Sequence, residues 1–174
     1  MNPEWIDDVS AVPELVSLFI RCAGTVYICQ GELLTGRADS PSSWSGDLPA
    51  LLAQDFAAAI ESGGEPSGRN GGILAIRVDG AVAGFAFVGL HRPLRKRPYA
   101  FLNDIVVDPA SRERGLGSVL VARLKEDLLS AGIDRLFLES GIGNLRAHAF
   151  FERHGFRKLS VAMMADLGTH PQAQ

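Results

Sequence analysis

The spacing of hydrophobic residues changes near residue 70, from a helical period to a strand-like one. Before that point, apolar side chains recur at helical spacing in two segments, roughly 12–23 and 47–61. We expect a helix in each segment, the first one capped by Ser10. The stretch between them contains several glycines and the run DSPSS (39–43), which predicts irregular structure.

From residue 73 the pattern becomes that of strands. The segments ILAIRV (73–78) and AVAGFAFVGL (81–90) flank Asp79-Gly80, a two-residue turn typical of a β-hairpin. The Gly- and Ser-rich stretch 61–72 before them predicts a loop. The best candidate for an additional first strand is Glu4–Val9.

The second half of the chain alternates strands and helices. The stretch FLNDIVV (101–107) is rich in apolar and β-branched residues and stops at Asp108-Pro109, and a helix is predicted after Gly117. Three more elements follow: a strand at 135–140, a helix at 145–154 capped by Asn144, and a final strand at 159–167. This order predicts an α/β (α+β) fold with a mixed, mostly antiparallel twisted sheet, a central βαβ unit and helices on both faces.

Composition narrows the class of protein. The 174 residues, 47% of them hydrophobic, suit a single domain spanning 1–174. The acidic start (1–9) does not resemble a signal peptide, and no apolar run approaches ~20 residues, so we expect no membrane segment and a cytoplasmic location. A net charge of −3 argues against a nucleic-acid partner. With only Cys22 and Cys29, and no clustered histidines, we expect free thiols and no metal site.

The sequence RERGLG (112–117) joins the central strand to the next helix. Gly115 and Gly117 leave the backbone uncovered where a helix start has unpaired N–H groups and the positive end of its dipole. This arrangement indicates an anion site, best suited to a phosphate. A Walker loop would need Lys and then Ser or Thr after the glycines, and a dinucleotide fingerprint would need a third glycine where Leu120 stands. The pattern that remains is Arg-x-x-Gly-x-Gly.

This pattern resembles the Arg/Gln-x-x-Gly-x-Gly/Ala signature of the GNAT superfamily of acetyl-CoA-dependent N-acetyltransferases. A second segment, NLRAHAFFERHGF (144–156), is similar to the family's Asn-x-x-Ala-x-x-x-Tyr-(three residues)-Gly-Phe segment. The resemblance covers roughly residues 71–167, an acetyl-CoA-binding core, and leaves 1–70 as a helical segment on the substrate side. It implies the GNAT fold, with acetyl-CoA as co-substrate.

The resemblance also implies three groups of contacts with acetyl-CoA. The pyrophosphate would be held near the Arg112 side chain by the backbone N–H groups of Arg114, Gly115, Leu116, Gly117 and Ser118. The pantetheine arm would pair with the backbone of Ile105, Val106 and Val107, and the Val106 N–H would polarise the thioester oxygen. On the following helix Asn144 would bond the pantetheine amide region, and Ala147 and Phe151 would pack beside it.

The implied reaction is direct transfer of an acetyl group to a primary amine, for which we expect a small-molecule acceptor. The amine must lose a proton before it can attack. The candidate bases are Glu139, at a position where N-terminal-alanine acetyltransferases of ribosomal proteins carry a glutamate, and Asp104 on the central strand. For each, the alternative is a solvated or salt-bridged strand residue. Because strand residues alternate faces, we do not expect Asn103 and Asp104 both to point at the substrate.

Phe151 departs from the family pattern. The family usually has a tyrosine there as general acid, and phenylalanine cannot donate a proton. Ser140, His148 or a water would have to replace it, or the thiolate would leave unaided. The alternative functions are a protein or peptide acetyltransferase and a non-catalytic acyl-CoA sensor.

Three further features have two interpretations each. The basic run HRPLRKR (91–97) predicts a solvated turn or, alternatively, a guide for an anionic substrate or for the CoA phosphates. Trp5, Tyr27 and Trp44 are expected to pack in the interior, with lining of a substrate pocket as the alternative. By analogy with relatives that dimerise through C-terminal strands, 159–167 could join two copies.

Overall fold

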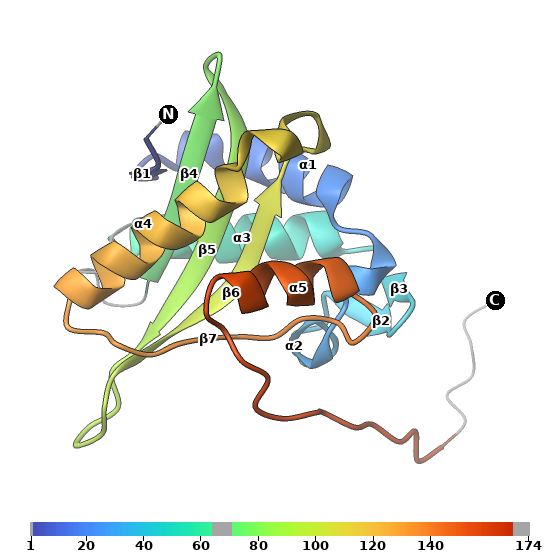
Figure 1. Ribbon diagram of the computed structural model, residues 1–174. Coiled ribbons are helices and arrows are strands. Elements are labelled where there is room, and N and C mark those ends of the chain that lie inside the picture. The colour runs from blue at the N-terminus through green and yellow to red at the C-terminus, as the bar shows by residue number, and fades with distance from the viewer. Residues whose placement is uncertain (1, 64–70, 169–174) are drawn as a thin grey trace.

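The computed structural model describes residues 2–63 and 71–168, which form one central sheet covered by helices (Figure 1). The sheet contains β1 (Glu4–Trp5), β4 (Gly71–Val78), β5 (Ala81–His91), β6 (Tyr99–Val107) and β7 (Leu136–Leu138). The α-helices are α1 (Val12–Cys22), α2 (Gln30–Leu34), α3 (Leu48–Glu61), α4 (Leu116–Ser130) and α5 (Leu145–Arg153). Short 3₁₀ turns are η1 (Val9–Ala11), η2 (Thr25–Tyr27) and η3 (Pro109–Arg114), and β2 (Ala38–Ser40) pairs with β3 (Ser43–Trp44) in a separate hairpin.

The strand order is β1-β4-β5-β6-β7, and every neighbouring pair is antiparallel except the parallel pair β6 and β7. The helix α4 connects these two parallel strands, as the predicted βαβ unit requires. The turn Asp79-Gly80 has φ values of 50° and 85°, the left-handed conformation of a tight hairpin turn. The predicted mixed, mostly antiparallel sheet is therefore confirmed.

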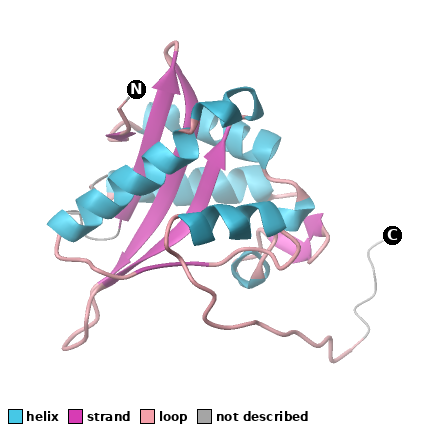
Figure 2. Ribbon diagram, in the orientation of Figure 1, coloured by secondary structure: helices cyan, strands magenta, loops and turns pink. Residues whose placement is uncertain are grey.

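Helices cover both faces of the sheet (Figure 2), and an apolar cluster lies on each face. On one face, α1 and α3 bury side chains such as Phe19 and Phe56 against Phe85 of β5. On the other face, α4 buries Leu120 and Leu124. Successive side chains of β5 point to opposite faces of the sheet, and both faces are buried. This explains why the sequence of β5 is almost continuously hydrophobic.

A β-bulge interrupts β6 at Asn103. Asp104 pairs with Phe87 and Leu102 pairs with Val88, which leaves Asn103 without a partner in β5. Phe87 packs with the α1–α3 cluster, so Asp104 lies on that face, and the Asn103 amide is 3.4 Å from the position of a Cβ on Gly89, also on that face. The bulge therefore places Asn103 and Asp104 on one face, although simple alternation would separate them.

The strands β6 and β7 pair only as far as Leu102 and Leu138. Beyond this point β6 continues to Val107, whereas the chain after β7 turns toward α5. The two parallel strands therefore separate just after the bulge.

The N-terminal segment contains more regular structure than its sequence predicts. The predicted helices correspond to α1 and α3, but Ser10 does not cap α1; instead the Asp8 side chain accepts the Ser10 N–H at 2.8 Å and caps η1. The predicted first strand is reduced to β1, which pairs with β4. The stretch expected to be irregular contains η2, α2 and the β2–β3 hairpin. Most of the loop predicted at 61–72 lies outside the described residues, and β4 already begins at Gly71.

The predicted final strand at 159–167 is wrong, because residues 157–168 form no helix or strand. They run along the outside of the molecule, away from the sheet (Figure 1). Their apolar side chains are solvent-exposed, Met163 at 95% and Leu167 at 98%. A strand needs a neighbour for its backbone groups, and within the described residues this segment has none.

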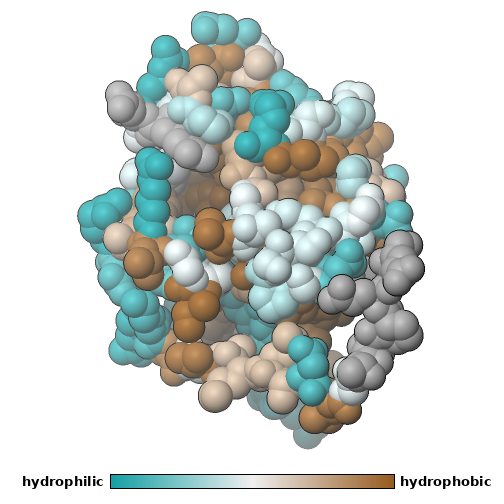
Figure 3. Space-filling view, turned by 90° about the vertical axis from the view of Figure 1, so that its right-hand side faces the viewer, coloured by the Kyte–Doolittle hydropathy of each residue, from teal (hydrophilic) through white to brown (hydrophobic). Residues whose placement is uncertain are grey.

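The surface on the side of α1, the β2–β3 hairpin and the tail is a mixture of polar and apolar residues, with the apolar ones in separate patches (Figure 3). Among the described residues, none of the helices has the length and apolar character needed to cross a bilayer. The cytoplasmic location stays a prediction from the sequence.

Candidate active site

A cavity of about 770 Å³ opens where β6 and β7 separate. One wall is the end of β6, from Ile105 to Val107, and the facing wall is α5 with the turn before it. One end of the cavity reaches Gly115 at the start of α4, and the other reaches Tyr27 and Glu139. The cavity therefore joins the predicted anion site to the bulge of β6.

The start of α4 has the geometry of an anion site. Gly115 adopts φ 71° and forms the N-cap, and its carbonyl accepts the N–H groups of Ser118 and Val119 at 3.0 and 3.2 Å. The Ser118 N–H, one of the predicted phosphate donors, is therefore already used within the helix. The N–H groups of Leu116 and Gly117 belong to the first turn and point out of the helix terminus, where an anion could bind them. A Cβ on Gly115 would meet no atom within 4 Å, so this glycine borders open space.

The side chains of the other residues predicted to contact the phosphates do not line the cavity within the described part of the chain. The Leu116 side chain is buried in the core, and the Arg114 side chain is exposed without lining the cavity. The Arg112 side chain lies outside the described part of the chain.

The α5 wall confirms the predicted cap. The Asn144 side chain accepts the Ala147 N–H at 3.3 Å, so it holds the first turn of α5 against the cavity. Ala147 and Phe151 both line the cavity, and the Phe151 ring makes edge contacts with Phe150 and Phe156. His148, a predicted alternative proton donor, does not line the cavity, whereas Ser140 does.

The N–H groups of β6 alternate between β5 and the cavity. Asp108 donates its N–H to Ala83 at 2.8 Å, on the β5 side, so Val106, two residues earlier, also points its N–H toward β5. The N–H groups of Ile105 and Val107 point the opposite way, toward the cavity. The Val106 N–H therefore does not face the cavity, contrary to its predicted role at the thioester, although all three residues line the cavity.

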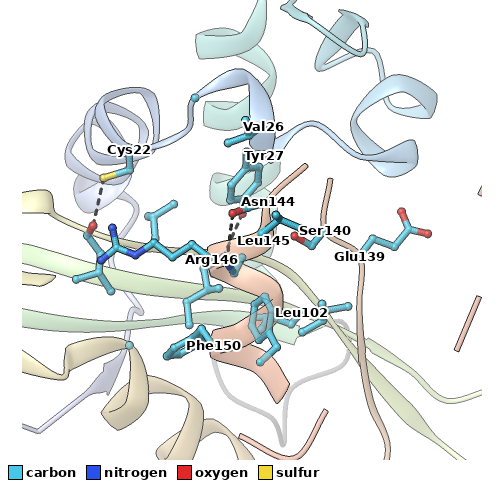
Figure 4. A pocket seen from close by; sticks show the side chains of 18 of the residues that line it. Cys22, Val26, Tyr27, Leu102, Glu139, Ser140, Asn144, Leu145, Arg146 and Phe150 are labelled. Carbon is cyan, nitrogen blue, oxygen red and sulfur yellow. Dashed lines mark hydrogen bonds between the residues drawn. The ribbon is translucent and has the colours of Figure 1, made fainter. Parts of the chain in front are cut away.

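Tyr27, in η2, lies between the cavity and the strand. Its ring lines the cavity, and its hydroxyl accepts the Ile105 N–H at 3.3 Å (Figure 4). The same hydroxyl donates to Asp104 Oδ1 at 3.1 Å. The sequence offered only a lone aromatic residue in an irregular stretch, so the site role of Tyr27 was the less favoured interpretation.

Asp104 belongs to a buried group of charges. The Arg37 guanidinium lies 3.0 Å from Asp104 Oδ2, 2.7 Å from Asp55 Oδ2 and 3.7 Å from Glu32 Oε2. Asp104, Arg37 and Glu32 are 1%, 5% and 5% exposed, and they are the buried charged residues of the described chain. The contact with Glu32 is too long for a hydrogen bond, and Glu32 Oε2 has no hydrogen-bond partner among the described residues.

The burial of this group changes its acid–base behaviour. Burial raises the pKa of Glu32 to about 7, helped by the negative charge of Asp104 and opposed by Arg37. Burial also raises the pKa of Asp104 above its ordinary value, although Arg37 and the Tyr27 hydroxyl act in the opposite direction. The pKa of Tyr27 is raised well above its ordinary value by burial and by the nearby Asp104 and Glu32 carboxylates. One guanidinium facing three carboxylates favours retention of a proton within the group.

Glu139 lines the cavity directly, unlike Asp104. Its Oε2 accepts the Gly31 N–H of α2 at 3.1 Å, and its carboxylate points away from Tyr27 and Asn144 (Figure 4). The two predicted bases thus differ in access: Glu139 is exposed at the cavity wall, and Asp104 lies beneath Tyr27.

The basic run 91–97 follows β5 and precedes β6, whereas the start of α4 follows the other end of β6. None of its residues lines the cavity within the described chain, so it is not placed to guide phosphates to α4. The Cys22 thiol lies 3.6 Å from the Val107 carbonyl oxygen, and Cys29 is half-buried.

Comparison with known proteins gives three kinds of match. The sequence matches the acetyltransferase (GNAT) family over residues 38–156. It is 37% identical over 62 residues to the [ribosomal protein bS18]-alanine N-acetyltransferase of Salmonella typhimurium, a match that covers 36% of this chain and 42% of that relative. The chain therefore matches less than half of the length of this curated relative.

Two solved structures share the fold at low sequence identity. A tetramutant of the BH1408 protein from Bacillus halodurans superposes with a TM-score of 0.73 at 20% identity, covering 96% of this chain and 100% of that one. The aminoglycoside N-acetyltransferase AAC(6')-Iy in complex with CoA gives a TM-score of 0.66 at 14% identity, covering 95% and 96%. The family match spans more than half of the sequence, and it includes the anion site, the bulge and α5. The chain therefore belongs to the acetyltransferase (GNAT) family.

Proposed function

We propose that this chain transfers an acetyl group from acetyl-CoA directly to the primary amine of a small molecule. The observation that carries the proposal is the single cavity that runs from the start of α4 to the bulge of β6. A ligand whose anionic group binds at one end of this cavity can extend an attached arm to the reaction position at the other end.

The residues at the α4 end fit the pyrophosphate of acetyl-CoA. The open space in front of Gly115 would admit a phosphate close to the backbone, and the helix supplies outward N–H groups at Leu116 and Gly117 together with its positive dipole end. Ser118 lines the same end and offers a hydroxyl. The proposed phosphate contacts also include the Arg112 and Arg114 side chains, as the family resemblance implies.

The walls of the cavity fit the pantetheine arm. On one side Val107 provides an outward strand N–H, while the outward Ile105 N–H already donates to the Tyr27 hydroxyl. On the other side Asn144, Ala147 and Phe151 form a polar and then apolar surface. Acetyl-CoA would supply the activated acyl group as a thioester.

Two groups at the far end would act on the acceptor. The exposed Glu139 carboxylate attracts an ammonium group to the cavity and is the candidate base with direct access. Asp104 can serve as a base only through an intermediate group, because it is 1% exposed and covered by Tyr27.

The N-terminal segment favours a compact acceptor. Val26 and Tyr27 of η2 form a wall over the reaction end of the cavity, and Cys22 of α1 lies next to Val107. A wall at this position restricts the room for an extended peptide. We therefore favour a small amine such as an aminoglycoside, a polyamine, an amino acid or an aminophosphonate.

A peptide or protein acceptor is the second candidate, favoured by one observation. The curated relative with 37% identity over 62 residues is a ribosomal-protein-alanine N-acetyltransferase. Glu139 is a further feature that would suit this activity. A domain that binds acyl-CoA without turnover is the third candidate, since Phe151 lacks the hydroxyl expected at that position.

A thiol-release assay tests these candidates. Acetyl-CoA would be incubated with the enzyme and with kanamycin, spermidine, lysine, aminoethylphosphonate or a peptide that begins with alanine. Release of CoA with one of the small amines supports the proposal, and release with the peptide alone supports the second candidate. Binding of acetyl-CoA without release would leave the third.

We also propose that two copies of the chain associate through residues 157–168. The tail carries exposed apolar side chains at Leu159, Val161, Met163, Met164 and Leu167. The outer edge of β7 ends the strand order of the described sheet. An exposed apolar segment and an open strand edge are complementary. Light scattering on the whole chain and on a variant ending at residue 156 would show a dimer and a monomer, respectively.

A further inference from the structure

The Tyr27 hydroxyl is held between the cavity and a buried carboxylate. It accepts the Ile105 N–H at 3.3 Å and donates its own proton to Asp104 Oδ1 at 3.1 Å. A phenol oxygen has two lone pairs, so one remains for a group in the cavity that the Tyr27 ring lines. The hydroxyl is therefore positioned to receive one proton while it gives up another.

Asp104 cannot exchange a proton with the cavity by itself. Its carboxylate is 1% exposed, one of its oxygens is paired with Arg37 at 3.0 Å, and the other accepts the Tyr27 hydroxyl. The cavity wall at this position consists of Tyr27 and the neighbouring strand residues, and it does not include Asp104. Any proton that reaches Asp104 from the acceptor would have to pass through Tyr27.

We propose that Tyr27 is a catalytic residue that carries the acceptor's proton from the cavity to Asp104. The inference rests on the proposed acetyl transfer. An N–H bond of the acceptor's ammonium group breaks and its proton moves to Tyr27 Oη, while the proton of Tyr27 moves to Asp104 Oδ1. The amine recovers its lone pair for attack on the acyl carbon, and Tyr27 remains neutral.

The remaining protons can be accounted for. A second proton of the attacking nitrogen leaves with the thiolate, which becomes the CoA thiol as the amide forms. The reverse shift then returns the proton of Asp104 through Tyr27 to water in the cavity. The cycle releases one proton in total, as the conversion of an ammonium group into an amide requires.

The charges around Asp104 support its role as the acceptor of this proton. The groups that face it are Tyr27 from η2, Glu32 from α2, Arg37 next to β2, and Asp55 from α3. Burial raises the pKa of Asp104, and the surplus of carboxylates over guanidinium favours an added proton. The raised pKa of Tyr27 keeps this residue neutral, as a proton carrier must be.

Few hydroxyl groups of the described chain face the cavity, because Phe151 replaces a tyrosine. Among the described residues that line the cavity, hydroxyl groups are present at Tyr27, Ser118 and Ser140. Ser118 lies at the phosphate end, so Tyr27 and Ser140 are the ones near the reaction position. Of these two, Tyr27 is the one hydrogen-bonded to a buried carboxylate.

The test compares Tyr27→Phe with Tyr99→Phe, because the chain has two tyrosines and Tyr99 stacks on His91 outside the cavity. Both variants would be assayed by thiol release with the best acceptor of the amine panel, across the pH range. We expect Tyr27→Phe to lower kcat by about 100-fold or more near neutral pH, with little change in KM for acetyl-CoA, and Tyr99→Phe to resemble the wild type. The loss should shrink as the pH approaches the pKa of the amine itself, since a neutral amine needs no base.

A purely structural role for Tyr27 predicts a different result. It would lower the melting temperature but leave the ratio of kcat between wild type and variant constant with pH, and that outcome would overturn the relay. A measurement on the wild type covers the case in which the variant does not fold. Turnover in mixtures of H₂O and D₂O should show a curved proton inventory, because two protons move together, whereas a rate independent of deuterium would overturn the proposal.

The failure of this inference can be told apart from failure of the proposed function. An active wild type with an equally active Tyr27→Phe variant removes the relay and leaves the acetyl transfer intact. A wild type without turnover on every amine and on the peptide removes both.

Discussion

The Arg37 guanidinium lies 3.0 Å from the Asp104 carboxylate, although the two residues are 67 positions apart in the sequence. This ion pair joins the N-terminal segment to the central strand β6 beneath the reaction end of the cavity. The described part of the N-terminal segment, residues 2–63, is thus a structural part of the site, because it supplies Tyr27 and the Arg37 partner of Asp104.

Replacement of Arg37 by methionine should strongly destabilise the fold. The variant would leave Asp104 and Glu32 buried without a cation, and removal of one partner of a buried ion pair costs about 3–5 kcal/mol. Denaturation with urea at pH 7 would measure the loss. As a control, Arg97→Met removes an exposed ion pair with Asp134 and should have a far smaller effect. A similar loss in both variants would contradict the importance of the buried pair.

Replacement of Glu32 by glutamine should stabilise the protein at high pH. The pKa of Glu32 is about 7 in the fold against an ordinary value of 4.5, so the folded state binds its proton more tightly than the unfolded chain does. The wild type therefore loses stability as the pH rises from 4.5 to about 7, by up to about 3 kcal/mol, and loses no more above that range.

The glutamine variant has no such proton to lose, so its advantage should be largest near pH 8 and vanish near pH 4. Urea unfolding of both proteins at several pH values would measure the difference. Parallel pH dependences of the two proteins would contradict a raised pKa at Glu32.

Replacement of Phe151 by tyrosine should leave the activity unchanged or raise it by up to about 10-fold. The Phe151 ring lines the cavity and packs against Phe150 and Phe156, and tyrosine keeps this ring while adding a hydroxyl as a second proton donor. The thiol-release assay and a melting curve would check the variant. A large loss of activity in a stable protein would mean that the ring has a role other than packing.

The parts of the site that could be predicted from sequence are those encoded locally. The start of α4 is specified by consecutive residues around Gly115, and the cap of α5 by Asn144 and the residues just after it. The hairpin turn Asp79-Gly80 is likewise specified by two adjacent residues. In these cases the backbone geometry follows from residue types that are neighbours in the chain.

The parts that could not be predicted depend on contacts between distant residues. Tyr27 and Asp104 are 77 positions apart, and nothing near Tyr27 in the sequence indicates its partner. The bulge at Asn103 reverses the side on which the following residues lie, and it arises from pairing with β5. The apolar residues at 159–167 do predict a strand, but no neighbour within the described chain pairs with it.

The central claim, that the start of α4 binds acetyl-CoA, is tested most directly by calorimetric titration of acetyl-CoA into Gly115 variants. Asparagine and aspartate both tolerate the left-handed conformation of Gly115 and both cap helices, so Gly115→Asn and Gly115→Asp should fold alike. They differ by one negative charge in the open space where the pyrophosphate would lie.

The account predicts that the wild type binds acetyl-CoA and that Gly115→Asp binds it about 10-fold or more weakly than Gly115→Asn, because the carboxylate repels the phosphates. Equal affinity in the two variants, or no binding by the wild type, would contradict it.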